Sequence, residues 1–103
     1  MMFMVRIDVT LPASMAQTEK DDFRRRENEN SMNLMKKGAL KRIWRIVGRV
    51  ANFSIWDVES LDELHAVLTG LPMFPFMDIS VVPLVQHPLT EIWTAQEGPL
   101  PAL

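Results

Sequence analysis

The chain has 103 residues, a formal net charge of −2 at pH 7 and no cysteine. This length allows one domain, and the absence of cysteine excludes disulfides, thiolate catalysis and zinc-thiolate or iron–sulfur sites. The slight acidity argues against a nucleic-acid partner, because phosphate binding requires an excess of basic residues. Hydrophobic residues make up 48% of the chain, a fraction typical of a folded globular protein.

Two features of the sequence bear on its location. No apolar run approaches the ~20 residues that a membrane-spanning helix needs. The N-terminal run MMFMVRID lacks the basic start and the long apolar stretch of a signal peptide. We therefore expect a cytoplasmic protein without a membrane partner.

The first third of the chain predicts a strand followed by a helix. Residues 3–11 alternate between apolar and polar side chains, which is the period of a β-strand. Residues 14–37 predict a helix, because Ser14 and Gln17 have the spacing of a capping box and Gly38 stands where a helix commonly ends.

The middle of the chain predicts a β-hairpin and a second helix. Residues 40–47 and 50–58 are rich in Ile, Val, Trp and Phe and are separated by Gly48-Arg49, which is typical of a hairpin. Ser60 and Glu63 then have the spacing of a capping box, and an apolar stripe follows them. The sequence thus places a helix directly after the hairpin.

The last part predicts one more strand and a tail. Residues 76–83 alternate again and follow a loop that contains proline. The order β-α-β-β-α-β predicts a ferredoxin-like α+β fold with an antiparallel sheet. We expect this domain to comprise residues 1–83, and residues 84–103 to form an extended C-terminal arm that packs on the body or on a neighbouring subunit.

The predicted sheet has apolar side chains on both faces. Two helices cover one face only, so the other face stays apolar and uncovered, which is typical of a protein–protein interface. Its side chains would include Trp44, Ile46, Phe53 and Ile55. The sequence therefore predicts a homo-oligomer.

Glu27 is the strongest candidate for acid–base chemistry. Its helical spacing from Phe23 and Leu34 turns it toward the sheet. Partial burial would raise the pKa of its carboxyl and suit it to proton transfer. The alternative is an exposed carboxylate paired with Arg24 or with an arginine of the sheet.

The hairpin brings further polar residues together. A two-residue turn pairs Val47 with Val50 and Arg45 with Asn52, and paired residues share a face of the sheet. Ser54 follows Asn52 by two positions, so we expect it on the same face.

Other polar residues have ordinary structural interpretations. His65 and His87 lack the spacing of metal ligands, and a hydrogen-bonded structural role is favoured for each, so no metal site is predicted. The run Arg24-Arg25-Arg26 is flanked by acidic residues and predicts a solvated helix face.

One known family carries the same runs of residues in the same order and spacing. They are FMVRIDVTLP, Glu27 in the first helix, IWRIVGRVANFSIWDV, SLDELHAVLTGLPMFPFMDI and VVPLVQHP. On these runs, which cover most of the chain, the sequence resembles the muconolactone delta-isomerases of aromatic-degradation pathways.

This resemblance implies a fold, an assembly and a reaction. The fold is a ferredoxin-like α+β protomer, and protomers pair sheet to sheet in a dimeric α+β barrel-type assembly that builds a ring-like homodecamer. The reaction moves a proton within a small lactone acid, (5-oxo-2,5-dihydrofuran-2-yl)acetate, and gives the enol-lactone of 3-oxoadipate in the β-ketoadipate pathway. The resemblance implies neither a metal nor an organic cofactor.

The resemblance also implies roles for the candidate residues. Glu27 would be the catalytic base, and it would return the proton to the carbon beside the lactone carbonyl. Arg45 would hold the substrate carboxylate unless it forms a structural ion pair. Asn52 would donate to the lactone carbonyl unless it is an ordinary polar strand residue. Val50 and Ser54 would complete the substrate-binding face.

One position departs from the family pattern. Members with muconolactone activity carry a tyrosine two residues before the asparagine that matches Asn52, whereas Val50 stands there in this chain, which has no tyrosine. Two alternatives to the isomerase therefore stay open. One is a dehalogenase of a chloromuconolactone on the same scaffold, and the other is a non-catalytic module that binds a small acid.

Overall fold

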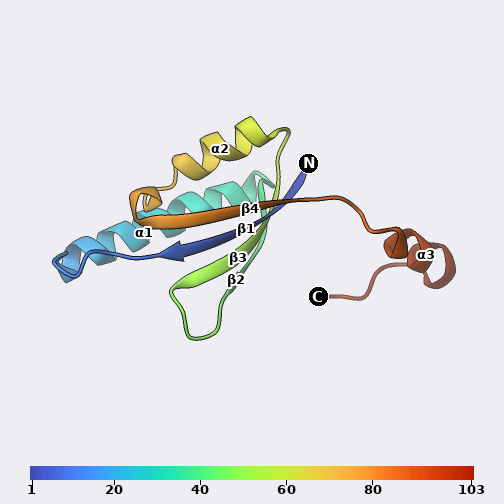
Figure 1. Ribbon diagram of the computed structural model, residues 1–103, viewed down its shortest axis with the longest axis horizontal. Coiled ribbons are helices and arrows are strands. Elements are labelled where there is room, and N and C mark those ends of the chain that lie inside the picture. Colours follow the sequence, from blue (N-terminus) through green and yellow to red (C-terminus); the bar gives the residue numbers. More distant parts are fainter.

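The computed structural model describes all of residues 1–103 and contains a four-stranded antiparallel sheet with two helices on one face (Figure 1). The strand order is β2-β3-β1-β4, which confirms the predicted ferredoxin-like arrangement. The elements in chain order are β1 (Met2–Val9), α1 (Gln17–Lys36), β2 (Leu40–Arg45), β3 (Ala51–Asp57), α2 (Leu61–Thr69), the 3-10 helix η1 (Phe74–Phe76), β4 (Met77–Leu84) and α3 (Pro88–Glu97).

The register of the sheet sets which side chains face α1 and α2. Val5 of β1 lies opposite Ser54 of β3 and Val81 of β4, and the alternate residues along each strand share that face. One hydrophobic cluster lies between this face and the helices. Its buried members are Phe3, Val5, Ile7, Leu40, Trp56, Val58, Leu64, Leu68 and Leu71.

The start of α1 differs from the prediction, whereas its end agrees with it. The helix begins at Gln17 without a side-chain cap, so the predicted capping box with Ser14 is wrong. Ser14 instead lies in a turn, in which the amide of Met15 donates to the carbonyl of Pro12 over 3.1 Å. At the other end Gly38 has a φ of +81°, which favours glycine, and closes the helix as predicted.

The start of α2 is confirmed in atomic detail. Ser60 accepts a hydrogen bond through Oγ from the amide of Glu63 at 3.1 Å. The Glu63 carboxylate accepts in turn from the amide of Glu59 at 2.7 Å. The first bond satisfies an amide that the first turn of a helix leaves without a partner, and the second ties the residue before the cap to the helix.

The hairpin keeps the predicted pairing of Arg45 with Asn52, but its loop is longer than predicted. The amide of Ile46 donates to the carbonyl of Ala51 at 3.0 Å, and residues 47–50 form a four-residue loop. The predicted ladder pair of Val47 with Val50 is therefore absent. A two-residue type I′ turn needs a positive φ at both central residues, and here only Gly48 has one.

The sheet face opposite α1 and α2 has no covering element (Figure 1). We call it the outer sheet face. Trp44 and Val82 on this face are 47% and 45% exposed, and only 12 of the 103 residues are buried in the whole chain. By the strand register, its apolar members are Met2, Met4, Trp44, Phe53, Ile55, Val82 and Leu84.

The C-terminal arm is partly helical, which corrects the prediction of an extended segment. After β4 the chain forms α3, where the His87 side chain accepts a hydrogen bond from the amide of Leu89 at 3.0 Å. Pro88 is the first residue of α3, a position that tolerates proline because the first amides of a helix need no acceptor. The arm does not pack on the body but projects from it (Figure 1). The radius of gyration is accordingly 16.2 Å, against about 13 Å for a compact chain of this length.

None of the helices is both long enough and apolar enough to cross a lipid bilayer.

Candidate active site

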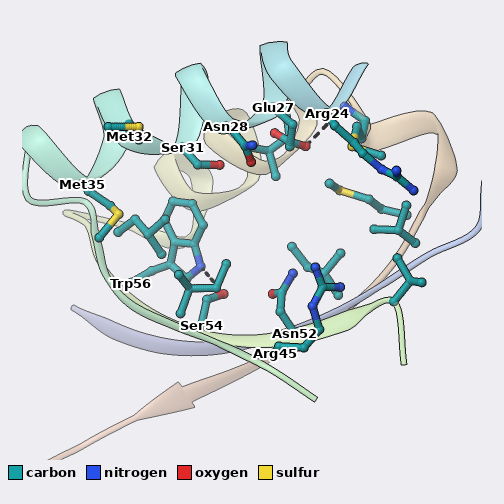
Figure 2. A pocket seen from close by; sticks show the side chains of 18 residues that line it. Arg24, Glu27, Asn28, Ser31, Met32, Met35, Arg45, Asn52, Ser54 and Trp56 are labelled. Atoms are coloured by element: carbon teal, nitrogen blue, oxygen red, sulfur yellow. Dashed lines mark hydrogen bonds between the residues drawn. The ribbon is translucent and has the colours of Figure 1, made fainter. Parts of the chain in front are cut away.

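A cavity of about 520 Å³ lies between α1 and the helix-facing side of the sheet (Figure 2). All five site residues predicted from the sequence line it. The full lining consists of Ile7, Val9, Arg24, Glu27, Asn28, Ser31, Met32, Met35, Leu40, Ile43, Arg45, Val50, Asn52, Ser54, Trp56, Leu71, Met73 and Met77.

Glu27 lies on α1 at the wall of this cavity (Figure 2). It is half-buried and makes no ion pair, so the alternative of an exposed, arginine-paired carboxylate is wrong. Oε1 accepts a hydrogen bond from the amide of Met73 at 3.3 Å, whereas Oε2 is buried without a partner. Burial raises the pKa of the Glu27 carboxyl above its usual range, and the bond from Met73 opposes that rise. The cavity wall therefore contains a carboxylate with one buried oxygen that has no hydrogen-bond partner.

Arg45 and Asn52 form the opposite wall, on neighbouring strands (Figure 2). Arg45 makes no ion pair, which removes its predicted alternative as a structural partner. Oδ1 of Asn52 is buried without a hydrogen-bond partner. Because buried polar atoms are usually paired, a free amide beside an unpaired guanidinium is typical of a surface that binds a ligand.

Ser54 lines the cavity but its hydroxyl is already engaged. It donates to the carbonyl of Val5 at 3.3 Å and accepts from Nε1 of Trp56 at 2.8 Å. Both side chains are buried, so this chain of hydrogen bonds fixes the Trp56 ring against the cavity. Val50, by contrast, is 58% exposed and leaves space at the hairpin end of the cavity.

The helix contributes residues that the sequence analysis did not select. They follow the helical spacing i, i+3, i+4, i+7, i+8 and i+11 from the first of them, and this spacing could have found them. With Glu27 they are Arg24, Asn28, Ser31, Met32 and Met35. The predicted solvated face is confirmed for Arg25, which pairs with Asp22 and Glu29, and for Arg26, which pairs with Asp22. Arg24 is exposed as well, but it also lines the cavity.

The cavity has a charged end and an apolar end. Arg24, Glu27, Arg45 and Asn52 lie toward one side, and Trp56 with Met32 and Met35 toward the other (Figure 2). Neither His65 nor His87 is part of it, and no group of three or more His, Asp or Glu side chains in the chain could hold a metal ion. Two cations and one carboxylate thus make the cavity suited to a small anion.

The fold and the cavity define a class: a small ferredoxin-like protein with one partly buried carboxylate facing an anion-accepting pocket. The comparisons name the family within it. Residues 1–90 match the profile of the muconolactone delta-isomerase family, and the chain belongs to that family of enzymes.

Individual proteins of this family are similar to the chain over most of its length. The muconolactone delta-isomerase of Cupriavidus pinatubonensis is 47% identical over 88 residues, which cover 85% of this chain and 96% of that protein. Muconolactone delta-isomerase 1 of Acinetobacter lwoffii is 50% identical over 88 residues, covering 85% and 92%. The crystal structure of a muconolactone isomerase superposes with a TM-score of 0.81 at 40% identity and covers 85% of this chain and 92% of that one.

Proposed function

We propose that this protein is a muconolactone delta-isomerase that moves a proton within (5-oxo-2,5-dihydrofuran-2-yl)acetate. One observation carries the proposal. Glu27 is the only cavity residue that can exchange a proton near neutral pH, because the other titratable residues there are two arginines, which stay charged. Burial raises the pKa of Glu27 toward the range in which a carboxyl serves as both base and acid.

The reaction needs one acid–base group that removes a proton from one ring carbon and returns a proton to another. The Glu27 carboxylate removes the proton from the ring carbon that bears the acetate arm, and the electron pair spreads through the C=C bond to the carbonyl oxygen of the lactone. The carboxylic acid then returns a proton to the ring carbon beside the carbonyl, and the double bond moves. Both carbons belong to one five-membered ring, so the free oxygen of Glu27 reaches them in turn.

The wall opposite Glu27 supplies charge and a donor. Arg45 holds the substrate carboxylate in a forked pair of hydrogen bonds. The Asn52 amide donates to the lactone carbonyl, where negative charge develops in the intermediate. The buried Trp56 ring, held by Ser54, forms an apolar wall beside the lactone ring.

The test is an NMR assay of the purified protein with muconolactone in D₂O. We expect conversion to the enol-lactone and deuterium at the carbon beside the carbonyl, to the extent that the Glu27 proton exchanges with solvent. Absence of turnover at micromolar enzyme would refute the proposal. Chloride release from a chloromuconolactone without any isomerisation would support the dehalogenase instead. The relatives all carry the isomerase name, which favours neither the dehalogenase nor the non-catalytic module.

The proposal includes a cytoplasmic location and a homo-oligomer, which the family resemblance describes as a decamer built from five dimers. The uncovered outer sheet face supports the pairing of subunits through it. Residues 84–103 would pack on a neighbouring subunit, since their exposed apolar side chains find no partner within the chain. These include Leu89, Ile92 and Trp93.

Assembly can be tested with one charge on the outer sheet face. Trp44→Glu is expected to reduce the mass measured by light scattering, because it buries a carboxylate in the paired sheets. Val47→Glu, in the hairpin loop and 95% exposed, is the control and should leave the mass unchanged. A wild-type mass of only 11.8 kDa at micromolar concentration would contradict the oligomer.

The substitution Val50→Tyr tests the position at which the chain departs from the family pattern. Val50 is 58% exposed and lines the cavity, so a phenol ring fits without displacing the core. We expect an unchanged melting temperature and a higher kcat/KM for unsubstituted muconolactone. An unchanged kcat/KM would place Val50 outside the region that contacts the substrate.

A further inference from the structure

Arg24 is the feature of the cavity that the proposed mechanism leaves unused. It is the first of three consecutive arginines on α1, and it alone of the three lines the cavity. Arg25 and Arg26 are held on the outer surface of the helix by Asp22 and Glu29, at distances of 2.8–3.0 Å. Arg24 has no acidic partner and no hydrogen bond from its side chain, although Glu27 follows it by one helical turn. Its guanidinium is therefore a free cation at the cavity.

A second free cation stands on the opposite wall. Figure 2 shows Arg24 reaching in from α1 and Arg45 from the sheet, both on the side of the cavity away from Trp56. Two unpaired guanidiniums in one cavity repel each other and together attract an anion. With Glu27 ionised, the side chains that line the cavity still carry one excess positive charge.

The polar groups of the cavity differ in exposure, and this difference predicts where the charged and the uncharged parts of a ligand bind. Both arginines are exposed, whereas the free atoms of Glu27 and Asn52 are buried. A ligand carboxylate is costly to desolvate and remains near the exposed guanidiniums. The uncharged ring then lies deeper, against the buried atoms that act on it.

We propose that Arg24 is a second carboxylate-binding residue, which grips the acid group of the bound ligand from the helix side while Arg45 grips it from the sheet. This proposal rests on the proposed function only for the identity of the acid. Because Arg24 lies one turn from Glu27 on the same helix, it can hold the acid arm while the ring lies beside Glu27. Arg24 is thus a determinant of specificity for lactones that carry an acid arm.

The experiment uses a ligand that cannot react. Calorimetry measures binding of the saturated lactone acid, 2-(5-oxotetrahydrofuran-2-yl)acetate, and of its methyl ester to the wild type and two variants. Arg24→Gln is expected to weaken binding of the acid by about tenfold or more, or about 1.4 kcal/mol, and to leave the ester unaffected. Arg25→Gln removes the same charge from the outer surface of the helix and should bind both ligands as the wild type does.

Kinetics provide a second readout. A contact that is equally strong in the ground state and the transition state changes KM and leaves kcat in place, so Arg24→Gln should raise KM for muconolactone with kcat retained. Equal affinity of the wild type and Arg24→Gln for the acid would overturn the proposal. So would an equal loss in Arg25→Gln, an equal loss for the ester, or a wild type that binds neither ligand. A wild type that binds the acid through Arg24 but does not isomerise muconolactone would overturn the proposed function alone.

Discussion

Replacement of Glu27 by glutamine is expected to lower kcat by about 10²–10⁴-fold, the range that general acid–base groups contribute. Glutamine keeps the shape and can still accept the hydrogen bond from the amide of Met73, but it cannot take or return a proton. Substrate affinity should change little, because the lost interaction belongs to the transition state. Steady-state and single-turnover kinetics measure both quantities.

The pH dependence provides an independent measurement. Burial raises the pKa of Glu27, so the kcat of the wild type should fall with decreasing pH along a limb centred above about 4.3, the ordinary value for glutamate. The residual activity of Glu27→Gln should lack this limb.

The raised pKa of Glu27 also makes the unfolding free energy depend on pH. A carboxyl with a raised pKa binds more protons in the folded state than in the unfolded state, so its contribution is present at low pH and is lost as pH rises through the folded pKa. Glu27 therefore lowers the unfolding free energy at neutral pH. Glu27→Gln should be at least as stable as the wild type at pH 7, and this advantage should shrink as pH falls.

A matched control lies on the same helix. Glu29 is exposed and pairs with Arg25 at 3.0 Å, away from the cavity. Glu29→Gln removes the same charge and should keep wild-type kcat. If Glu27→Gln retains more than half of wild-type kcat on a good substrate, or if the two variants lose activity equally, Glu27 is not the base.

The alternation of the strands and the end of α1 could be predicted because local chemistry determines them. The apolar positions of β1 set its buried face, and Gly38 closes the helix with a positive φ that other residues rarely adopt. The pairing of Arg45 with Asn52 was also predictable, because a two-residue loop and the observed four-residue loop centred on Gly48-Arg49 give the same register. The loop itself was not, because its length depends on which residues can take a positive φ.

The helical wall of the cavity was only partly predictable. A search for apolar stripes finds Leu34, which packs against the core, but the cavity stripe on α1 mixes cations, amides and methionines. Such a stripe looks like a solvated face until the sheet opposite it is known. The run of three arginines predicts a solvated face for that reason, although the spacing of three between Arg24 and Glu27 puts both residues on one side of the helix.

The helix in the C-terminal arm, residues 84–103, was not predicted from the sequence. Pro88 is compatible with a helix because it stands at the first helical position, which accepts proline. The family match ends at residue 90, within α3, so the residues after it have no counterpart in the matched profile. Within the chain α3 projects from the body, so no contact with the sheet or with the other helices determines its position.

Replacement of Asn52 by leucine is expected to lower kcat by about 10²–10³-fold, the usual cost of losing one donor to a developing oxyanion. The change should cost no stability. Asn52 makes no side-chain hydrogen bond and its Oδ1 is buried without a partner, a state that costs about 1–3 kcal/mol. Leucine has a similar shape and no polar atom to leave unpaired, so the unfolding free energy should stay equal or rise while kcat and kcat/KM fall together.

Asn33→Leu, on the exposed surface of α1 outside the cavity, is the control and should keep both activity and stability. Denaturant unfolding and steady-state kinetics on the same preparations separate the two roles. A leucine variant that loses stability in proportion to activity would assign Asn52 to the structure of the sheet, whereas a variant that becomes inactive without unfolding places its amide at the reacting carbonyl.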